Sequence, residues 1–145
     1  MALASLLSGL SLANAGLGAV HGFAAPIGGM FPAPHGAVCA ALLPHVMEVN
    51  IRALQQRQPQ SDVLARFDEV ARLVTVKADA TGNDGVAWIR ELGGAMNIPQ
   101  LASYGIKPAD VPALCEKAAQ ASSMKGNPLP LLPDELEEIL SRAMR

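Results

Sequence analysis

Charged side chains are missing from the first third of this chain. Residues Met1 to Met47 contain no Lys, Arg, Asp or Glu, and Glu48 is the first charge. Aromatic residues are also scarce, at 3% of the chain, although 50% of its residues are hydrophobic. A core of this kind is built mainly from Ala, Leu, Val, Ile and Met, which suits packed helices better than sheets. With 145 residues, we therefore expect one all-α domain over residues 1–145.

Other absences exclude classes of partner. The net charge is only −2 and no basic run with interleaved aromatics occurs, so nucleic acid is not an expected partner. No glycine-rich phosphate loop follows a strand, so a nucleotide-binding fingerprint is missing. The apolar N-terminal run has no basic flank and is interrupted by Gly, Asn and Pro, which argues against a signal peptide and a membrane span. Cys39 and Cys115 are too few for a disulfide framework, so we expect a reducing, cytoplasmic setting.

Hydrophobic spacing predicts a series of helices separated by glycine, proline and polar segments. The first two are Ala2–Ala13 and Gly18–Ile27, followed by a loop over Gly28–Pro34. The next helix opens at Pro34-His35-Gly36 and continues through Val49, with a polar connection over Leu54–Gln60. Ser61 is the expected N-cap of the following helix. The expected later helices are Asp62–Val74, Gly85–Met96, Val111–Ser123 and Asp134–Met144.

His21 and His35 are the main polar side chains of the uncharged third, and each is followed by glycine. Imidazole binds zinc and iron(II), but such sites need three or four protein ligands. Further donors nearby are Cys39, one helical turn after His35 and on the same face, together with His45 and Glu48. The alternative to a metal site is a structural role, in which both histidines lie in the core or cap helices and bond to backbone carbonyls. The spacing alone favours this alternative.

The residues around the pair carry more information. The chain reads Asn14-Ala15-Gly16-Leu17-Gly18-Ala19-Val20-His21-Gly22, then Pro26-Ile27-Gly28-Gly29, Pro34-His35-Gly36 and Leu42-Leu43-Pro44-His45-Val46-Met47. Near the C-terminus it reads Met124-Lys125-Gly126-Asn127-Pro128, and later Glu138-Ile139-Leu140. Over essentially the whole chain, this pattern resembles the C-terminal helical domain of the iron-containing (group III) alcohol dehydrogenases, which has the dehydroquinate synthase-like α-fold.

The resemblance implies a metal site and a cofactor. Enzymes of this family join a Rossmann-like NAD(P) domain to an all-α domain, and one Asp and three His bind divalent iron or zinc. The metal polarises the alcohol or carbonyl oxygen during hydride transfer. By matching motif, His21 and His35 would be the last two of these four ligands. His45 matches a position that is not a ligand, and we expect it to orient its helix by hydrogen bonding.

Three departures from the family pattern limit what the resemblance implies. First, residues 1–145 lack the preceding Asp and His ligands and the dinucleotide domain. Second, Ala25 stands where many members have another histidine. Third, Leu129 stands where a basic residue often follows Asn-Pro. We therefore expect a C-terminal part of an NAD- or NADP-dependent alcohol dehydrogenase, inactive alone, whose partner is the N-terminal dinucleotide-binding half. The exposed apolar surface would favour a homo-oligomer.

Two other interpretations stay open. The chain could be a non-catalytic helical assembly module that associates through its Ala2–Met47 surface. It could instead be a small self-contained metal-binding protein that uses His21, His35 and Cys39.

Overall fold

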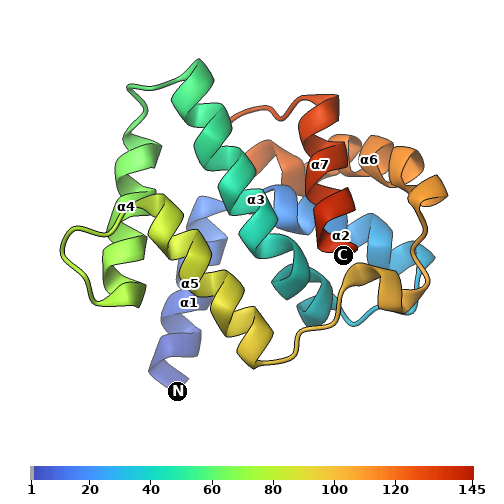
Figure 1. Ribbon diagram of the computed structural model, residues 1–145, viewed down its shortest axis with the longest axis horizontal. Coiled ribbons are helices and arrows are strands. Elements are labelled where there is room, and N and C mark those ends of the chain that lie inside the picture. Colours follow the sequence, from blue (N-terminus) through green and yellow to red (C-terminus); the bar gives the residue numbers. More distant parts are fainter. Residues whose placement is uncertain (1) are drawn as a thin grey trace.

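The computed structural model describes residues 2–145 and is built from helices, as Figure 1 shows. No strand occurs among these described residues, which confirms the predicted all-α class. The α-helices are α1 (Ala2–Ala15), α2 (Ala19–Met30), α3 (His35–Arg57), α4 (Asp62–Thr75), α5 (Gly82–Ala95), α6 (Val111–Gln120) and α7 (Pro133–Ala143). Short 3₁₀ turns lie at Leu101–Tyr104, Pro108–Asp110 and Ser122–Gly126.

Helix α3 lies at the centre of the molecule. It packs against α2 and α7 on one side and against α5 and α4 on the other, as can be followed in Figure 1. The main core forms where α2, α3, α6 and α7 meet, and its fully buried side chains include Phe23, Ile27, Leu42, Leu114 and Ile139. Burial of these apolar side chains is the principal stabilising contribution to this part of the fold.

By length and composition, α3 and the bent pair of α1 and α2 could each cross a membrane, but 56% of the most apolar window of α3 is buried inside this fold. The core contacts of α3 therefore account for its apolar character.

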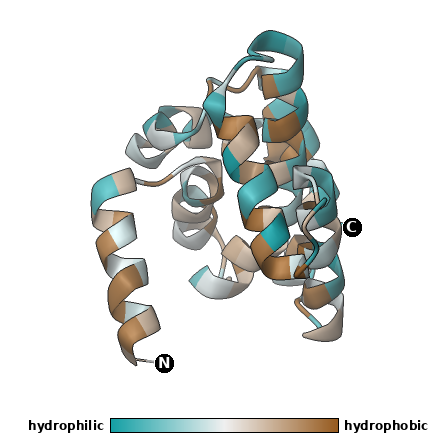
Figure 2. Ribbon diagram, turned by 90° about the vertical axis from the view of Figure 1, so that its left-hand side faces the viewer, coloured by the Kyte–Doolittle hydropathy of each residue, from teal (hydrophilic) through white to brown (hydrophobic). Residues whose placement is uncertain are grey.

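Helix α1 differs from the other α-helices because none of its residues is buried. It meets α2 at an angle of 98°, and Figure 2 shows it standing beside the rest of the molecule. The chain turns at Gly16, whose φ of +76° is readily adopted only by glycine. Five leucines of α1 are at least half exposed: Leu3, Leu6, Leu7, Leu10 and Leu12.

Two predicted helix ends are wrong because tertiary contacts extend the helices. Helix α2 continues through Pro26 to Met30, where a loop is predicted from Gly28, since the buried Ala24 and Ile27 hold its last turns against the core. Helix α3 continues to Arg57, where a polar connection is predicted from Leu54. Leu54 is fully buried, and the Arg57 guanidinium donates to Glu135 of α7.

Capping residues set the starts of the next two helices. The Ser61 hydroxyl accepts a hydrogen bond from the Val63 N–H, which confirms the predicted N-cap of α4. Helix α5 begins at Gly82, three residues before the predicted start, because Thr81 and Asp84 form a capping box. In this box the Asp84 carboxylate accepts from the Thr81 N–H at 2.8 Å.

Candidate metal centre

The fold brings His21 and His35 together, although fourteen residues separate them in the sequence. His21 lies in the first turn of α2, and His35 is the first residue of α3. Their ring centroids are 5.2 Å apart, and the ring planes are inclined at 50°. His21 is half-buried and His35 is exposed, so both rings are accessible from the surface of residues 2–145.

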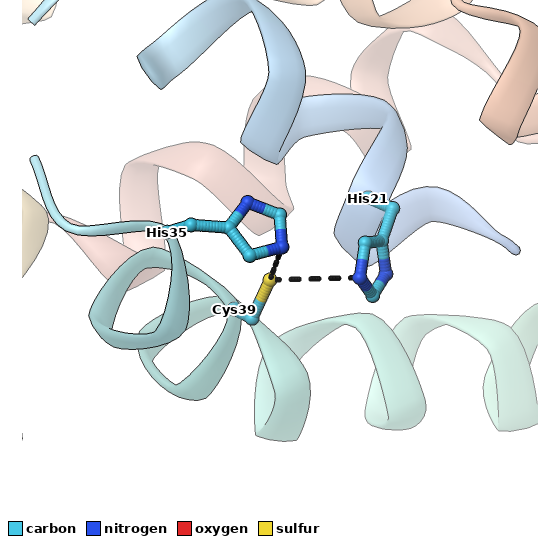
Figure 3. A group of neighbouring side chains, drawn as sticks. All are labelled: His21, His35 and Cys39. Carbon is cyan, nitrogen blue, oxygen red and sulfur yellow. Dashed lines mark hydrogen bonds between the residues drawn. The ribbon is translucent and has the colours of Figure 1, made fainter. Parts of the chain in front are cut away.

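The Cys39 sulfur lies between the two rings, as Figure 3 shows. It is 3.5 Å from Nε2 of His35, one turn earlier on α3, and 3.9 Å from Nε2 of His21. The expectation that Cys39 shares the helix face of His35 is confirmed. Burial raises the pKa of the Cys39 thiol above its usual value. The three donor atoms lie within 4.8 Å of one another.

This donor set fits a divalent ion of the class that the sequence resemblance implies. Imidazole nitrogen is a ligand for zinc and iron(II), and thiolate sulfur adds a ligand that zinc accepts. The alternative interpretation expects each histidine to bond to a backbone carbonyl. Among residues 2–145, the side-chain hydrogen-bond contacts of these two imidazoles are instead with Cys39, and their rings contact each other.

The other nearby donors, Glu48 and His45, lie outside this cluster. Glu48 accepts hydrogen bonds from Arg90 and Arg142, each at 2.7 Å. Burial raises the pKa of the Glu48 carboxyl, but the bonds from these two guanidinium groups outweigh it and lower the pKa overall. Glu48 thus joins helices α3, α5 and α7.

His45 does not make the expected hydrogen bond through Nδ1, which is buried without a partner among residues 2–145. Burial, and then the charges of Arg142 and Arg90, lower the pKa of His45 and favour the neutral ring. The expectation that His45 orients α3 by hydrogen bonding is therefore not met at this nitrogen.

A groove of about 540 Å³ lies beside the histidine cluster. His21 and Cys39 lie on its wall, and the rest of its lining is mainly apolar. The linker between α1 and α2 forms one side, and α3 forms the other through Leu43, Val46 and Met47. An apolar groove with a few polar donors at one end is the usual form of a site for a small organic ligand.

Asn127 supports the helix that carries His21, and sequence reasoning missed this role. Helix α2 has no side-chain cap of its own, but Oδ1 of Asn127 accepts from the Ala19 N–H at 3.1 Å. Nδ2 of Asn127 donates to Oδ1 of Asn50 in α3 at 2.8 Å and to the carbonyl of Leu129. Asn50 donates back to Oδ1 of Asn127. One side chain thereby fixes the start of α2 relative to α3.

Two glycines allow close packing around this junction. A methyl group at Gly126 would overlap the backbone carbonyl of Leu17, which precedes α2. At Gly22, it would lie 2.7 Å from Cε of Met124. Neighbouring Leu129, which stands where a basic residue often occurs in the resembled family, is buried against Ala53 and Leu54. The segment after α6 thus supports the start of α2 directly.

The family model of the Fe-containing alcohol dehydrogenase family, C-terminal, matches residues 1–144. The chain belongs to the Fe-containing alcohol dehydrogenase family. It corresponds to the C-terminal part of these enzymes, and its helical fold is the one found there.

Relatives and solved structures agree with this membership. The chain is 31% identical to lactaldehyde reductase of Escherichia coli (strain K12) over 99% of its own length and 37% of that protein. It is 35% identical to 1,3-propanediol dehydrogenase of Klebsiella pneumoniae over 99% of its length and 36% of that protein. A crystal structure of 1,3-propanediol oxidoreductase superposes with a TM-score of 0.82 at 32% identity, over 97% of this chain and 36% of the other. An alcohol dehydrogenase from Oenococcus oeni gives a TM-score of 0.79 at 30% identity, over 94% of this chain and 35% of the other.

Proposed function

We propose that this chain supplies the metal-binding helical part of an NAD- or NADP-dependent alcohol dehydrogenase, with His21 and His35 as two of the metal ligands. The observation that carries the proposal is the convergence of the two imidazoles, whose ring centroids lie 5.2 Å apart, in a member of this family, with His21 on the wall of an apolar groove. A divalent iron or zinc ion bound there would polarise the oxygen of an alcohol or carbonyl substrate.

The residues of the chain contribute binding and orientation. His21 and His35 hold Nε2 atoms toward a common point, and the Asn127 cap fixes the turn of α2 from which His21 projects. The apolar groove wall next to His21 excludes water from the carbon skeleton of a small alcohol. The short-chain diol and lactaldehyde in the names of the relatives indicate the size of substrate to test first.

We further propose that the remaining ligands and the dinucleotide-binding half come from sequence outside residues 1–145, on the same or another polypeptide. The exposed leucines of α1 support this proposal, because a large apolar surface rarely stays exposed on a monomer. Without its partner half the chain is expected to self-associate through this surface. The burial of much of α3 inside the fold supports a location away from the membrane, and the free thiols of Cys39 and Cys115 support a reducing, cytoplasmic one.

Complementation tests the proposal. The chain is mixed with the N-terminal half of a relative such as the Escherichia coli lactaldehyde reductase and loaded with iron(II) or zinc. Formation of NADH or NADPH is then followed with propane-1,3-diol and propane-1,2-diol. We expect metal-dependent alcohol oxidation that is lost in H21A and H35A but kept in H45A, the matched control outside the cluster. An assembled, metal-loaded complex that oxidises no alcohol with either cofactor would overturn the proposal.

The exposed α1 also favours a second candidate, a non-catalytic module that assembles through this helix. Light scattering of the chain alone, with and without EDTA, tests it. This candidate expects a stable oligomer that is insensitive to the chelator and that dissociates when residues 2–15 are removed. A monomer at high concentration would argue against it.

A further inference from the structure

Cys39 differs from the other cysteine of the chain in its surroundings. Cys115 lies in α6, is 7% exposed and packs in the main core; burial, and then the charge of Glu137, raise its pKa to about 11. Cys39 is half-buried at the wall of the groove, and its sulfur faces two imidazole nitrogens from two different helices. Cys115 is a small apolar side chain, whereas Cys39 is one of three adjacent metal donors.

The distances between the donors match those of a metal site. Ligand bonds of about 2.3 Å to sulfur and about 2.0 to 2.1 Å to nitrogen, arranged tetrahedrally, place sulfur and nitrogen about 3.6 Å apart. The two distances from Cys39 Sγ, 3.5 Å and 3.9 Å, lie on either side of this value. The remaining donor pair, His21 and His35, lies within 4.8 Å, and a small rotation of the exposed His35 side chain would bring its nitrogen to ligand distance.

We propose that Cys39 is a third metal ligand in the isolated chain and that His21, His35 and Cys39 together bind one divalent zinc-class ion before any donor of the partner half is present. The inference rests on the proposed function for the assignment of the two histidines and adds a sulfur ligand to it. A thiolate favours zinc over harder ions, so this site discriminates against manganese and magnesium. Three protein ligands leave one position of a tetrahedral ion, which water fills in the isolated chain.

Cobalt(II) replaces zinc as the spectroscopic probe, because a cobalt–thiolate bond gives a charge-transfer band in the near ultraviolet that imidazole ligands do not give. The full 145-residue chain, reduced and metal-free, is titrated with cobalt(II) as wild type, C39S and C115S. We expect the band in wild type and C115S and its loss in C39S. The dissociation constant of C39S should rise at least about tenfold, since loss of even an outer-shell partner costs 10- to 100-fold.

A second measurement does not depend on the variants folding. X-ray absorption of the zinc-loaded wild-type chain should show one sulfur neighbour at about 2.3 Å together with nitrogen or oxygen neighbours. Circular dichroism of each variant checks that its helices are retained.

The outcomes separate this inference from the proposed function. A cobalt complex without the charge-transfer band, a zinc spectrum without sulfur, or wild-type affinity in a folded C39S would overturn the role of Cys39. So would a wild-type chain that binds neither ion. None of these results bears on the complementation assay, which fails or succeeds through alcohol oxidation and its dependence on His21 and His35.

Discussion

Helices α1 and α3 are both rich in apolar residues, yet their environments are opposite. Helix α3 has ten buried residues and contacts helices on several sides. Helix α1 has no buried residue. Neither helix has an acidic residue in its first turn. Composition alone therefore does not determine burial in this molecule. The exposed leucines of α1 support the proposal that this helix contacts a partner, whereas Leu42 and Leu54 of α3 are fully buried in the fold.

The largest expected effect is the difference in stability between a leucine substitution in α3 and one in α1. Leu42 of α3 is fully buried, and L42A should reduce the free energy of unfolding by roughly 2–5 kcal/mol through loss of burial and formation of a cavity. Leu7 of α1 is 54% exposed, and L7A should change it by less than about 0.5 kcal/mol. Urea unfolding of both variants makes the comparison. Similar losses in the two would show that α1 is packed in solution.

An intermediate effect is expected where the α1–α2 linker meets the body of the molecule. Because a methyl group at Gly126 would overlap the Leu17 carbonyl, G126A should destabilise the chain by about 1–3 kcal/mol. Gly28 is the matched control: it lies inside α2, and beyond the backbone of its own helix no atom lies within 4 Å of an added methyl group. G28A should stabilise by roughly 0.5–1 kcal/mol. Thermal unfolding measures both, and a neutral G126A would contradict the close approach.

The smallest effect concerns the polar side of α3. Glu138 of α7 accepts hydrogen bonds from Arg52 of α3 and from Arg142, and these bonds lower the pKa of its carboxyl below the ordinary value of 4.5. Since the pKa is depressed on folding, the stabilisation is present above pH 4.5 and is lost as the pH falls through the folded-state pKa. E138Q should therefore cost about 0.2–1 kcal/mol at pH 7 and progressively less in acid. Unfolding by urea at pH 7, 5 and 3 tests this, and a difference that grew in acid would refute it.

Most of the fold was predictable because its signals are local. Apolar spacing gave the helices, Ser61 gave the start of α4, and the four-residue spacing of His35 and Cys39 placed both on one face of α3. The helix ends at Met30 and Arg57 were not predictable, since they depend on burial of Ile27 and Leu54 by distant segments. Local propensity at Gly28 and in the glutamine-rich segment points the other way.

The candidate site was predictable only in part. The sequence placed His21 and His35 as a pair, and the assignment of both as ligands stays a prediction. The support from Asn127 was beyond sequence reasoning, because 108 positions separate Asn127 from the Ala19 N–H to which it bonds. No local sequence pattern predicts a contact over this separation. The buried, unpaired Nδ1 of His45 was likewise invisible without the packing around α3.

The cap that Asn127 provides also has a consequence for the order of events during synthesis. His21 is made before Asn127, and more than a hundred residues lie between it and the side chain that completes the start of α2. While the chain is being translated, His21 therefore projects from a helix whose first N–H groups are not yet satisfied by Asn127. The final position of His21 relative to α3 is therefore fixed only after Asn127 has been made, and premature termination before Asn127 leaves both histidines present but α2 without this cap.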